Sequence, residues 1–266
     1  MKNLFDKFKP TYVFHAAAYK HVPLVEHNPL AAIKTNILGA QNIIEMALEK
    51  GVNKVIALST DKASAPINLY GATKLTSDKL FVAANNLTGS KSISFSVVRY
   101  GNVMGSRGSV IPLFKSLRSS GVLPITDPRM TRFMISLEHG VELVWHAFED
   151  MIGGEVYVKK IPSMKVADIA RVIAPNAKHK IVGIRPGEKL HEQMIGIEDA
   201  PFTYEYDEHF KILPSIHDWA KSEDRIKNGK LVAEDFVYAS NTNSEWMVPA
   251  DLQRWIDANR YEIGKI

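Results

Sequence analysis

Tyr70 and Lys74 stand four positions apart, a spacing that puts both side chains on one face of a helix. A lysine ammonium beside a phenol favours the phenolate and lowers its pKa. A tyrosine poised in this way can act as a general base toward a sugar hydroxyl. Thr60 lies ten residues before Tyr70, and the apolar run 54–58 predicts a strand that leads to it. We therefore expect these residues at the carboxyl edge of a sheet, where open α/β sheets bind ligands.

Two further side chains with acid–base chemistry, Asp61 and Lys62, follow Thr60 directly. A carboxyl group can protonate a leaving group, and burial can lower a lysine pKa enough to supply a neutral amine. The alternative interpretation of an Asp-Lys pair is an exposed turn. The position immediately after a predicted strand favours the functional interpretation.

A second Tyr-x-x-x-Lys runs from Tyr261 to Lys265. This copy contains Gly264 and has no serine or threonine ten residues upstream. We interpret it as ordinary surface sequence.

The first two-thirds of the chain alternate strand and helix patterns. We expect strands at 12–15, 54–58 and 93–100, a helix that starts at Asn28-Pro29 and closes at Gly51, and another from about 70 to 86. This order, with nearly continuous apolar strands, predicts an α/β fold with a parallel sheet covered on both faces.

After Gly101 the predicted elements are shorter and are separated by glycine and proline. Helices at 137–151 and 249–259 and a strand at 155–158 are the clearest of them. We expect residues 1–103 and 138–160 to form the sheet domain, and residues 104–137 and 161–266 to form a smaller α+β substrate-binding portion.

Composition restricts the classes of function. The 266 residues are 45% hydrophobic and 23% charged, which excludes a disordered or fibrous chain. There is no cysteine, which excludes a disulfide scaffold, a cysteine nucleophile and thiolate metal centres. His191-Glu192 lacks the second histidine of the H-E-x-x-H motif, so we expect no metal site.

The net charge of +4 comes from scattered basic residues rather than from a basic run, so we expect no nucleic-acid partner. No stretch approaches 18 consecutive apolar residues, and the first residues lack the apolar core of a signal peptide. We expect a cytoplasmic protein without a membrane partner.

Several stretches in addition to Thr60, Tyr70 and Lys74 carry a specific resemblance. With the strand end His15-Ala16-Ala17-Ala18, they resemble the extended short-chain dehydrogenase/reductase family, in its polysaccharide-biosynthesis branch of nucleotide-sugar dehydratases. The matching stretches are Ser59-Thr60-Asp61-Lys62-Ala63, Arg99-Tyr100-Gly101-Asn102-Val103-Met104-Gly105-Ser106-Arg107-Gly108-Ser109, Met130-Thr131-Arg132-Phe133 and Ile184-Arg185-Pro186-Gly187-Glu188-Lys189-Leu190-His191-Glu192.

The resemblance implies a Rossmann-like sheet domain that binds NADP, with NAD as the alternative, and a homo-oligomer. It implies C5-inverting 4,6-dehydration of UDP-N-acetylglucosamine, as in pseudaminic acid synthesis for flagellin glycosylation. That reaction oxidises C4, eliminates water across C5 and C6, and returns the hydride to C6 to give a 4-keto-6-deoxy product.

The resemblance also implies the catalytic roles. Tyr70 takes the O4 proton, and Lys74 holds the phenolate and the nicotinamide ribose. Lys62 is the C5 base, Asp61 protonates the departing C6 hydroxyl, and Thr60 hydrogen-bonds the sugar.

Binding residues are implied in the same way. Ala16 and Lys20 belong to the cofactor site together with Tyr70 and Lys74, and Lys20 also reaches the substrate. Asn102 contacts the nucleotide sugar, and Arg132 and Arg185 contact its diphosphate through their planar guanidinium groups. Glu188 accepts from a ribose hydroxyl or holds an arginine; the alternative is a carboxylate at a helix start.

The sequence departs from the family at its front. A dinucleotide-binding domain starts with a strand, a Gly-rich turn and a helix, and no G-x-G-x-x-G occurs in this chain. We therefore expect an N-terminally truncated Rossmann-like sheet, poor NADP binding and little dehydratase activity from the chain as it stands.

Two alternatives remain open. A UDP-sugar epimerase of the same family needs Tyr70 and Lys74 but neither a C5 base nor a C6 acid, so the Asp61-Lys62 pair argues against it. A non-catalytic nucleotide-sugar-binding remnant is the other alternative, and a cofactor assay separates it from the enzymes.

Overall fold

The computed structural model describes residues 1–89, 91–216 and 222–265. These residues form two compact units. Unit 1 consists of Met1–Tyr100, Val141–Lys160 and Met194–Val237, and unit 2 of Gly101–Gly140, Ile161–Gln193 and Tyr238–Ile266. No helix in the described part of the chain combines the length and apolar character that a membrane crossing requires.

Unit 1 is built on one mixed sheet, which confirms the predicted α/β fold. Four parallel strands lie in the order β1, β2, β3, β7, and three antiparallel strands extend the sheet in the order β12, β11, β13. Their bounds are Tyr12–His15, Lys54–Thr60, Ser94–Tyr100, Val156–Lys159, His209–Ile212, Thr203–Glu205 and Lys230–Leu231.

The antiparallel extension differs from the expected division of the chain. The sequence assigned all of 161–266 to the second portion, whereas Met194–Val237 lies in unit 1. The physical reason is strand pairing, because β12 hydrogen-bonds along β7 from His209–Lys159 to Ile212–Val156.

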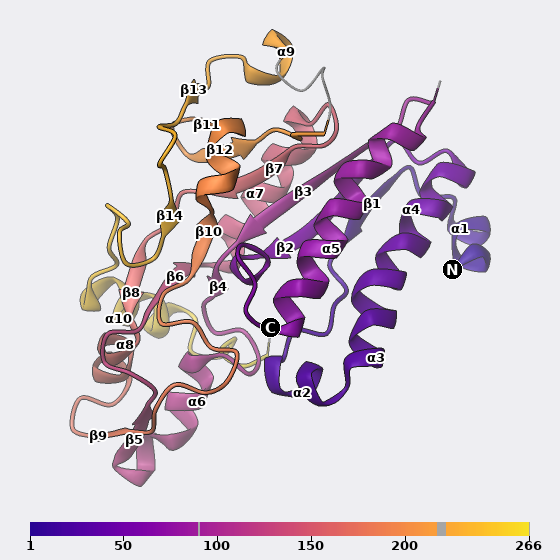
Figure 1. Ribbon diagram of the computed structural model, residues 1–266. Coiled ribbons are helices and arrows are strands. Elements are labelled where there is room, and N and C mark those ends of the chain that lie inside the picture. The colour runs from indigo at the N-terminus through magenta and orange to yellow at the C-terminus, as the bar shows by residue number, and fades with distance from the viewer. Residues whose placement is uncertain (90, 217–221, 266) are drawn as a thin grey trace. The chain divides into compact units, whose positions relative to one another are not determined.

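Helices cover both faces of the parallel strands, as predicted. On one face Phe81 of α5 (Leu69–Ala84) packs against Phe95 of β3, and α4 (Gly39–Lys50) lies beside α5 (Figure 1). On the other face, the side chains from α7 (Leu137–Asp150) join Ile56 and Val98 in a buried cluster. Unit 1 also contains α1 (Lys2–Phe8), α2 (Val22–His27), α9 (Glu223–Ile226) and short 3-10 turns at Asp61–Ala63, Asn85–Leu87 and Ile197–Phe202.

The helix predicted from Asn28 to Gly51 is interrupted. It runs as α3 (Pro29–Ala32), a π-helical turn over Ile33–Leu38, and then α4. Gly51 closes it in the left-handed conformation (φ +71°), as expected of a helix C-terminus. π-helical turns occur frequently at functional sites, and this one holds the buried Asn36.

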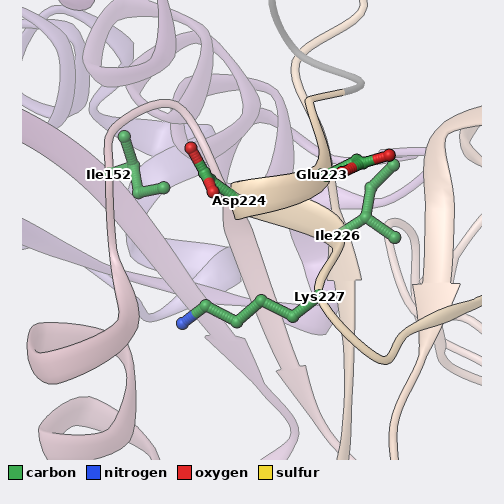
Figure 2. Close-up of a pocket in the computed structure, with 5 residues that line it drawn as sticks. All are labelled: Ile152, Glu223, Asp224, Ile226 and Lys227. Atoms are coloured by element: carbon green, nitrogen blue, oxygen red, sulfur yellow. The ribbon is translucent and has the colours of Figure 1, made fainter.

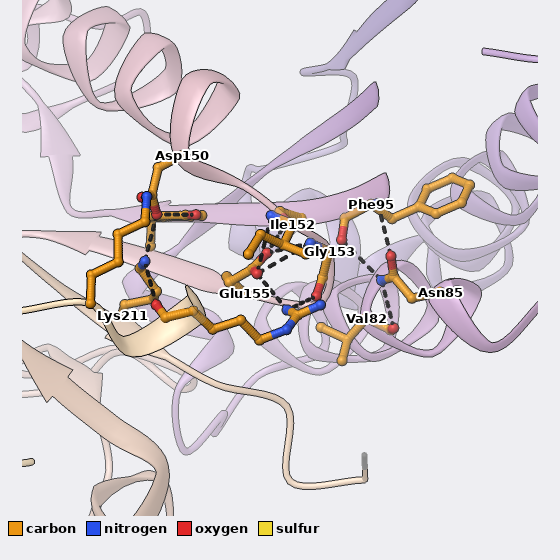
Figure 3. A network of polar contacts seen from close by, with 12 residues as sticks. Val82, Asn85, Phe95, Asp150, Ile152, Gly153, Glu155 and Lys211 are labelled. Atoms are coloured by element: carbon orange, nitrogen blue, oxygen red, sulfur yellow. Dashed lines mark hydrogen bonds and ion pairs between the residues drawn. The ribbon is translucent and has the colours of Figure 1, made fainter. Parts of the chain in front are cut away.

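A polar network fastens the antiparallel strands to the parallel ones (Figure 3). Glu155 is 1% exposed and accepts hydrogen bonds from Ser96 Oγ at 2.7 Å and from Arg225 Nη1 at 2.5 Å. Asp150 pairs with the buried Lys211 at 2.5 Å. Both carboxylates are compensated by a cation and by further donors, as buried charges require.

Unit 2 is a smaller α+β unit with its own apolar core, in which residues from α6, α8 and strands β5 and β6 meet Leu252 of α10. Its three-stranded sheet has the order β4, β6, β8, and β5 pairs in parallel with β9. The bounds are β4 Asn102–Val103, α6 Val110–Leu117, β5 Val122–Ile125, β6 Thr131–Ile135, β8 Ser163–Lys165, α8 Val166–Ile173, β9 Lys178–Ile181 and α10 Pro249–Ala258, with a 3-10 turn at Arg118–Ser120. Two further strands are β10 (Gln193–Ile195) and β14 (Tyr238–Ala239).

Candidate active site

The site in unit 1 begins where β2 ends. Thr60 is the last residue of the strand, and a 3-10 turn over Asp61–Ala63 follows at once. Thr60 Oγ1 donates to Asp61 Oδ1 at 2.9 Å, and Lys62 Nζ lies 3.1 Å from the same oxygen. Asp61 is 1% exposed, whereas the Lys62 side chain is 24% exposed. The Asp61-Lys62 pair is therefore an ion pair with a buried acid, and not an exposed turn.

Helix α5 brings Tyr70 and Lys74 to the same place. The Asn68 side chain caps the helix by accepting from Gly71 N at 2.8 Å. At Gly71 a Cβ would lie 2.1 Å from the Lys62 carbonyl oxygen, so only glycine lets the first turn of α5 lie against the Asp61–Ala63 turn. Tyr70 and Lys74 are buried on the same helix, as the spacing predicted.

The pKa of Tyr70 departs from the expected direction. Burial raises this pKa to about 12, and the nearby charge of Lys62 and a hydrogen bond with Thr60 only partly oppose it. The sequence interpretation was wrong on this point: it considered the lysine charge and not the loss of water around the phenol. Lys62, rather than Lys74, is the main cation that favours the phenolate here.

Lys74 lies deep in the fold. It is 3% exposed, and its Nζ donates to the Leu58 carbonyl at 2.9 Å. Burial lowers the pKa of Lys74, and the charge of Asp78 opposes this effect. His15, at the end of β1, is buried with the charge of Lys74 nearby, and burial together with that charge lowers the pKa of His15 to about 4.

The sequence analysis missed Asn36, which organises the loop after β1. This amide is 1% exposed; its Oδ1 accepts from Tyr19 N at 2.8 Å, and its Nδ2 donates to the Tyr19 carbonyl and to Thr73 Oγ1, both at 3.0 Å. It thereby fixes the segment that holds Ala16 and Lys20 against α5. An asparagine inside a helical pattern was the available signal, because that position disfavours it unless its side chain has a partner.

Lys20 is exposed in this loop, and it lines a cavity of about 260 Å³ together with Tyr19, His21 and Leu24. A larger cavity, of about 750 Å³, lies beside α9 and is lined by Ile152, Glu223, Asp224, Ile226 and Lys227 (Figure 2). None of the expected site residues lines the larger cavity, so its volume alone is no guide to the chemistry.

Arg132 lies in unit 2, where the protein itself occupies its guanidinium group. Nη1 donates to the carbonyls of Thr131 at 2.7 Å and Leu190 at 3.2 Å, and Nη2 donates to that of Lys189 at 3.0 Å. Nε lies 3.6 Å from a Glu192 carboxylate oxygen. In this structure Arg132 fastens the segment 189–192 to β6.

Arg185, by contrast, is 65% exposed and forms an ion pair with Glu188. Residues 184–192 contain no helix, so Glu188 is not a carboxylate at a helix start, and the alternative in which it holds an arginine is the one observed. Burial raises the pKa of Glu188, but its contacts with Arg185 outweigh this and lower it overall.

Asn102 opens β4, where it pairs with Met134 of β6. Its Oδ1 is buried and has no hydrogen-bond partner within the described residues. The predicted residues thus form two groups. Thr60, Asp61, Lys62, Tyr70 and Lys74 gather in unit 1 with the loop of Ala16 and Lys20, and Asn102, Arg132, Arg185 and Glu188 belong to unit 2.

The second Tyr-x-x-x-Lys lies outside any helix. Tyr261 follows the end of α10 in a series of turns and is 68% exposed, so no helix face joins it to Lys265. In residues 1–89, 91–216 and 222–265 no three histidine or acidic side chains are grouped so as to hold a metal ion.

Comparison with known proteins gives a consistent result. A family model described as polysaccharide biosynthesis protein matches residues 1–214. The chain is 57% identical over 248 residues to the UDP-N-acetylglucosamine 4,6-dehydratase (inverting) of Campylobacter jejuni subsp. jejuni serotype O:2, covering 91% of this chain and 74% of the relative. It is also 42% identical over 227 residues to the UDP-glucose 4-epimerase of Rickettsia canadensis, covering 84% of this chain and 67% of that one.

A solved structure agrees with this likeness. The X-ray structure of Pen from Bacillus thuringiensis superimposes with a TM-score of 0.83 at 35% sequence identity. The match covers 94% of this chain and 76% of that protein.

Proposed function

Because the chain belongs to the polysaccharide biosynthesis protein family, we propose that it is a nucleotide-sugar 4,6-dehydratase that acts on UDP-N-acetylglucosamine with inversion at C5. The Campylobacter relative carries this activity in its name at 57% identity, which supports the substrate and the stereochemistry. The product is a UDP-4-keto-6-deoxy-N-acetylhexosamine.

The observation that carries the proposal is the Asp61–Lys62 ion pair. Elimination across C5 and C6 needs a base for the C5 proton and a protonated acid for the C6 hydroxyl, and a lysine can be that base only as the neutral amine. Transfer of one proton along the 3.1 Å contact from Lys62 Nζ to Asp61 Oδ1 produces both groups at once. An epimerase would have no use for this pair.

The residues then act in sequence. Tyr70 accepts the O4 proton, aided by Thr60 and by the charge of Lys62, which both favour the phenolate. The resulting C4 ketone acidifies the C5 proton, which Lys62 removes. The carboxyl group of Asp61 donates a proton to the C6 oxygen, and water leaves, which gives a C5–C6 alkene conjugated with the ketone. After hydride adds at C6, a proton from solvent adds to C5 on the face opposite to the one that lost its proton, and C5 is thereby inverted. Each step uses a group that reaches the end of β2 or the first turn of α5.

The donor set suits a nicotinamide dinucleotide. The Lys74 ammonium carries three donors and spends one on the Leu58 carbonyl, which leaves two for ribose hydroxyls. When bound, such a cofactor accepts a hydride from C4 and returns it to C6. Ala16, Lys20, Tyr70 and Lys74 would hold its nicotinamide half, with NADP as the proposed form.

We assign the nucleotide sugar to unit 2. Arg185 has the exposed guanidinium group that suits the diphosphate, and Glu188 forms an ion pair with that group. Arg132 holds the following residues of that segment in place through its hydrogen bonds to backbone carbonyls. Asn102 has a buried amide oxygen without a hydrogen-bond donor among the described residues.

A direct test joins the chain to the Gly-rich strand–turn–helix segment of its family, incubates it with UDP-N-acetylglucosamine and NADP in deuterated water, and follows the sugar by NMR. We expect a 4-keto-6-deoxy product with inverted C5 and solvent deuterium at that carbon. A product that differs from the substrate only in the configuration at C4, with C6 still hydroxylated, would refute the proposal.

That second outcome corresponds to a UDP-sugar 4-epimerase, which the 42% identity to the Rickettsia relative supports. The Asp61→Asn variant separates the two functions. It should abolish dehydration, whereas an epimerase should retain most of its activity.

A further inference from the structure

Asp78 is a buried carboxylate on α5, one helical turn beyond Lys74. It is 2% exposed, and its Oδ2 accepts from Ser59 Oγ at 2.6 Å and from Arg99 Nη2 at 3.4 Å. Ser59 of β2 and Arg99 of β3 are register partners. The carboxylate therefore ties α5 to the carboxyl ends of two adjacent strands.

The charge on Asp78 is only partly neutralised. Arg99 also donates to the Met194 carbonyl at 2.8 Å and lies 3.8 Å from an Asp199 oxygen, so its cation is shared. Asp78 Oδ1 has no hydrogen-bond partner among the described residues. A buried charge with an open oxygen exerts a strong field on its neighbours, because little water screens it.

Lys74 is the neighbour whose charged form this field stabilises. The i,i+4 spacing on α5 places the two side chains on one face. The Lys74 ammonium is buried, and its hydrogen-bond acceptor, the Leu58 carbonyl, carries no charge. A buried ammonium without an opposite charge nearby tends to lose its proton.

We propose that Asp78 is a positioning residue for the reaction: it holds Lys74 in the charged ammonium form at the point where α5 meets the sheet. The kinetic consequence rests on the proposed function, whereas the electrostatic one is a property of the folded chain. Other titratable or charged groups on α5 and on the elements packed against it include His15 on β1, Asp61 and Lys62 after β2, Arg99 and Tyr100 on β3, Tyr70 and Lys79 on α5, Glu26 on α2 and Lys34 in the π-helical turn.

The test measures the titration of Lys74 directly. Lysine labelled with 13C at Cε is followed by NMR from neutral to alkaline pH, and Lys74→Met assigns the signal. In Asp78→Asn, which keeps the shape and removes the charge, we expect the pKa of Lys74 to fall by roughly one to two units. In Asp78→Glu, which keeps the charge, the pKa of Lys74 should stay close to its wild-type value.

The chain supplies a matched control in Glu155→Gln. Glu155 is also a buried carboxylate that accepts from a serine on a strand, Ser96, and from an arginine, Arg225. Glu155 lies immediately before β7, the strand that pairs with β3 on the side opposite to β2. Its neutralisation should leave the Lys74 titration unchanged.

The kinetic arm compares the pH dependence of dehydration. In Asp78→Asn the alkaline limb of kcat should move to lower pH by the same one to two units, with the KM for the sugar nucleotide unchanged. The Glu155→Gln profile should keep the wild-type limbs.

Several results would overturn the inference. One is an unchanged Lys74 pKa in Asp78→Asn; another is an equal shift in Glu155→Gln. Ser59→Ala keeps the carboxylate charge and loses one hydrogen bond, so a large Lys74 shift in that variant would also refute a role through charge, even if Asp78→Asn did not fold. If the Lys74 shift occurs but the wild-type chain, joined to the Gly-rich segment of its family, does not dehydrate the sugar, the proposed function fails and the electrostatic inference stands.

Discussion

Replacement of Lys62 by alanine should affect two steps of the reaction to different degrees. The ammonium lies 3.1 Å from Asp61 and is the main charge that favours the phenolate of Tyr70. Loss of a general base typically slows its step about 10²–10⁴-fold. We therefore expect elimination to fall by that factor, which corresponds to about 3–5 kcal/mol of transition-state stabilisation.

The oxidation step should suffer less. Without the cation, the already raised pKa of Tyr70 should rise further, which slows proton removal from O4 at neutral pH. A more alkaline buffer should speed oxidation, because it increases the fraction of phenolate, but it should not restore elimination. The two effects can thus be separated by pH alone.

The assay combines stopped-flow absorbance of the reduced nicotinamide with NMR of the sugar. In Lys62→Ala at alkaline pH, reduced cofactor should accumulate with substrate, and C5 should take up no deuterium from solvent. Lys34→Ala removes an exposed lysine of the same unit and serves as the control. Dehydration at the wild-type rate in Lys62→Ala, or rapid deuterium uptake at C5, would refute the assignment of the base.

Other substitutions and a pH change give independent checks. Tyr70→Phe should block oxidation, so any reduced-nicotinamide absorbance that builds up with substrate in this variant would contradict its role. Arg185→Ala should weaken UDP binding about 10–150-fold by calorimetry, from the loss of charge-assisted hydrogen bonds, with little change in unfolding. Arg132→Ala should instead lower the free energy of unfolding by about 3 kcal/mol, because it strands buried carbonyls; an unchanged urea midpoint would refute this. The pKa of His15 is about 4 in the fold against 6.5 ordinarily, so the unfolded chain binds the extra proton between these values and stability should fall by about 3 kcal/mol as pH drops through that range. Urea unfolding at both ends of the range, with His15→Gln losing the dependence, checks it, and a flat profile would contradict it.

The local sequence determined the elements and the side chains that share them. Apolar runs and helical spacing placed β1, β2, β3, α5 and α10 within a few residues of their observed bounds. The four-residue spacing of Tyr70 and Lys74 fixed their common helix face, and the missing upstream threonine correctly set the second Tyr-x-x-x-Lys aside. These features follow from backbone periodicity, which depends only on neighbours along the chain.

The tertiary structure decided the features that depend on contacts between distant segments, namely hydrogen-bond partners, strand pairing and burial. The guanidinium of Arg132 is occupied by carbonyls 57 and 58 residues away, and Asn36 meets Thr73 across 37 residues. The pairing of β12 with β7 moved Met194–Val237 into unit 1. Burial reversed the expected shift of the Tyr70 pKa. The identity of a residue states which bonds and charges it can offer, but its partners and the water around it are set only when distant segments meet.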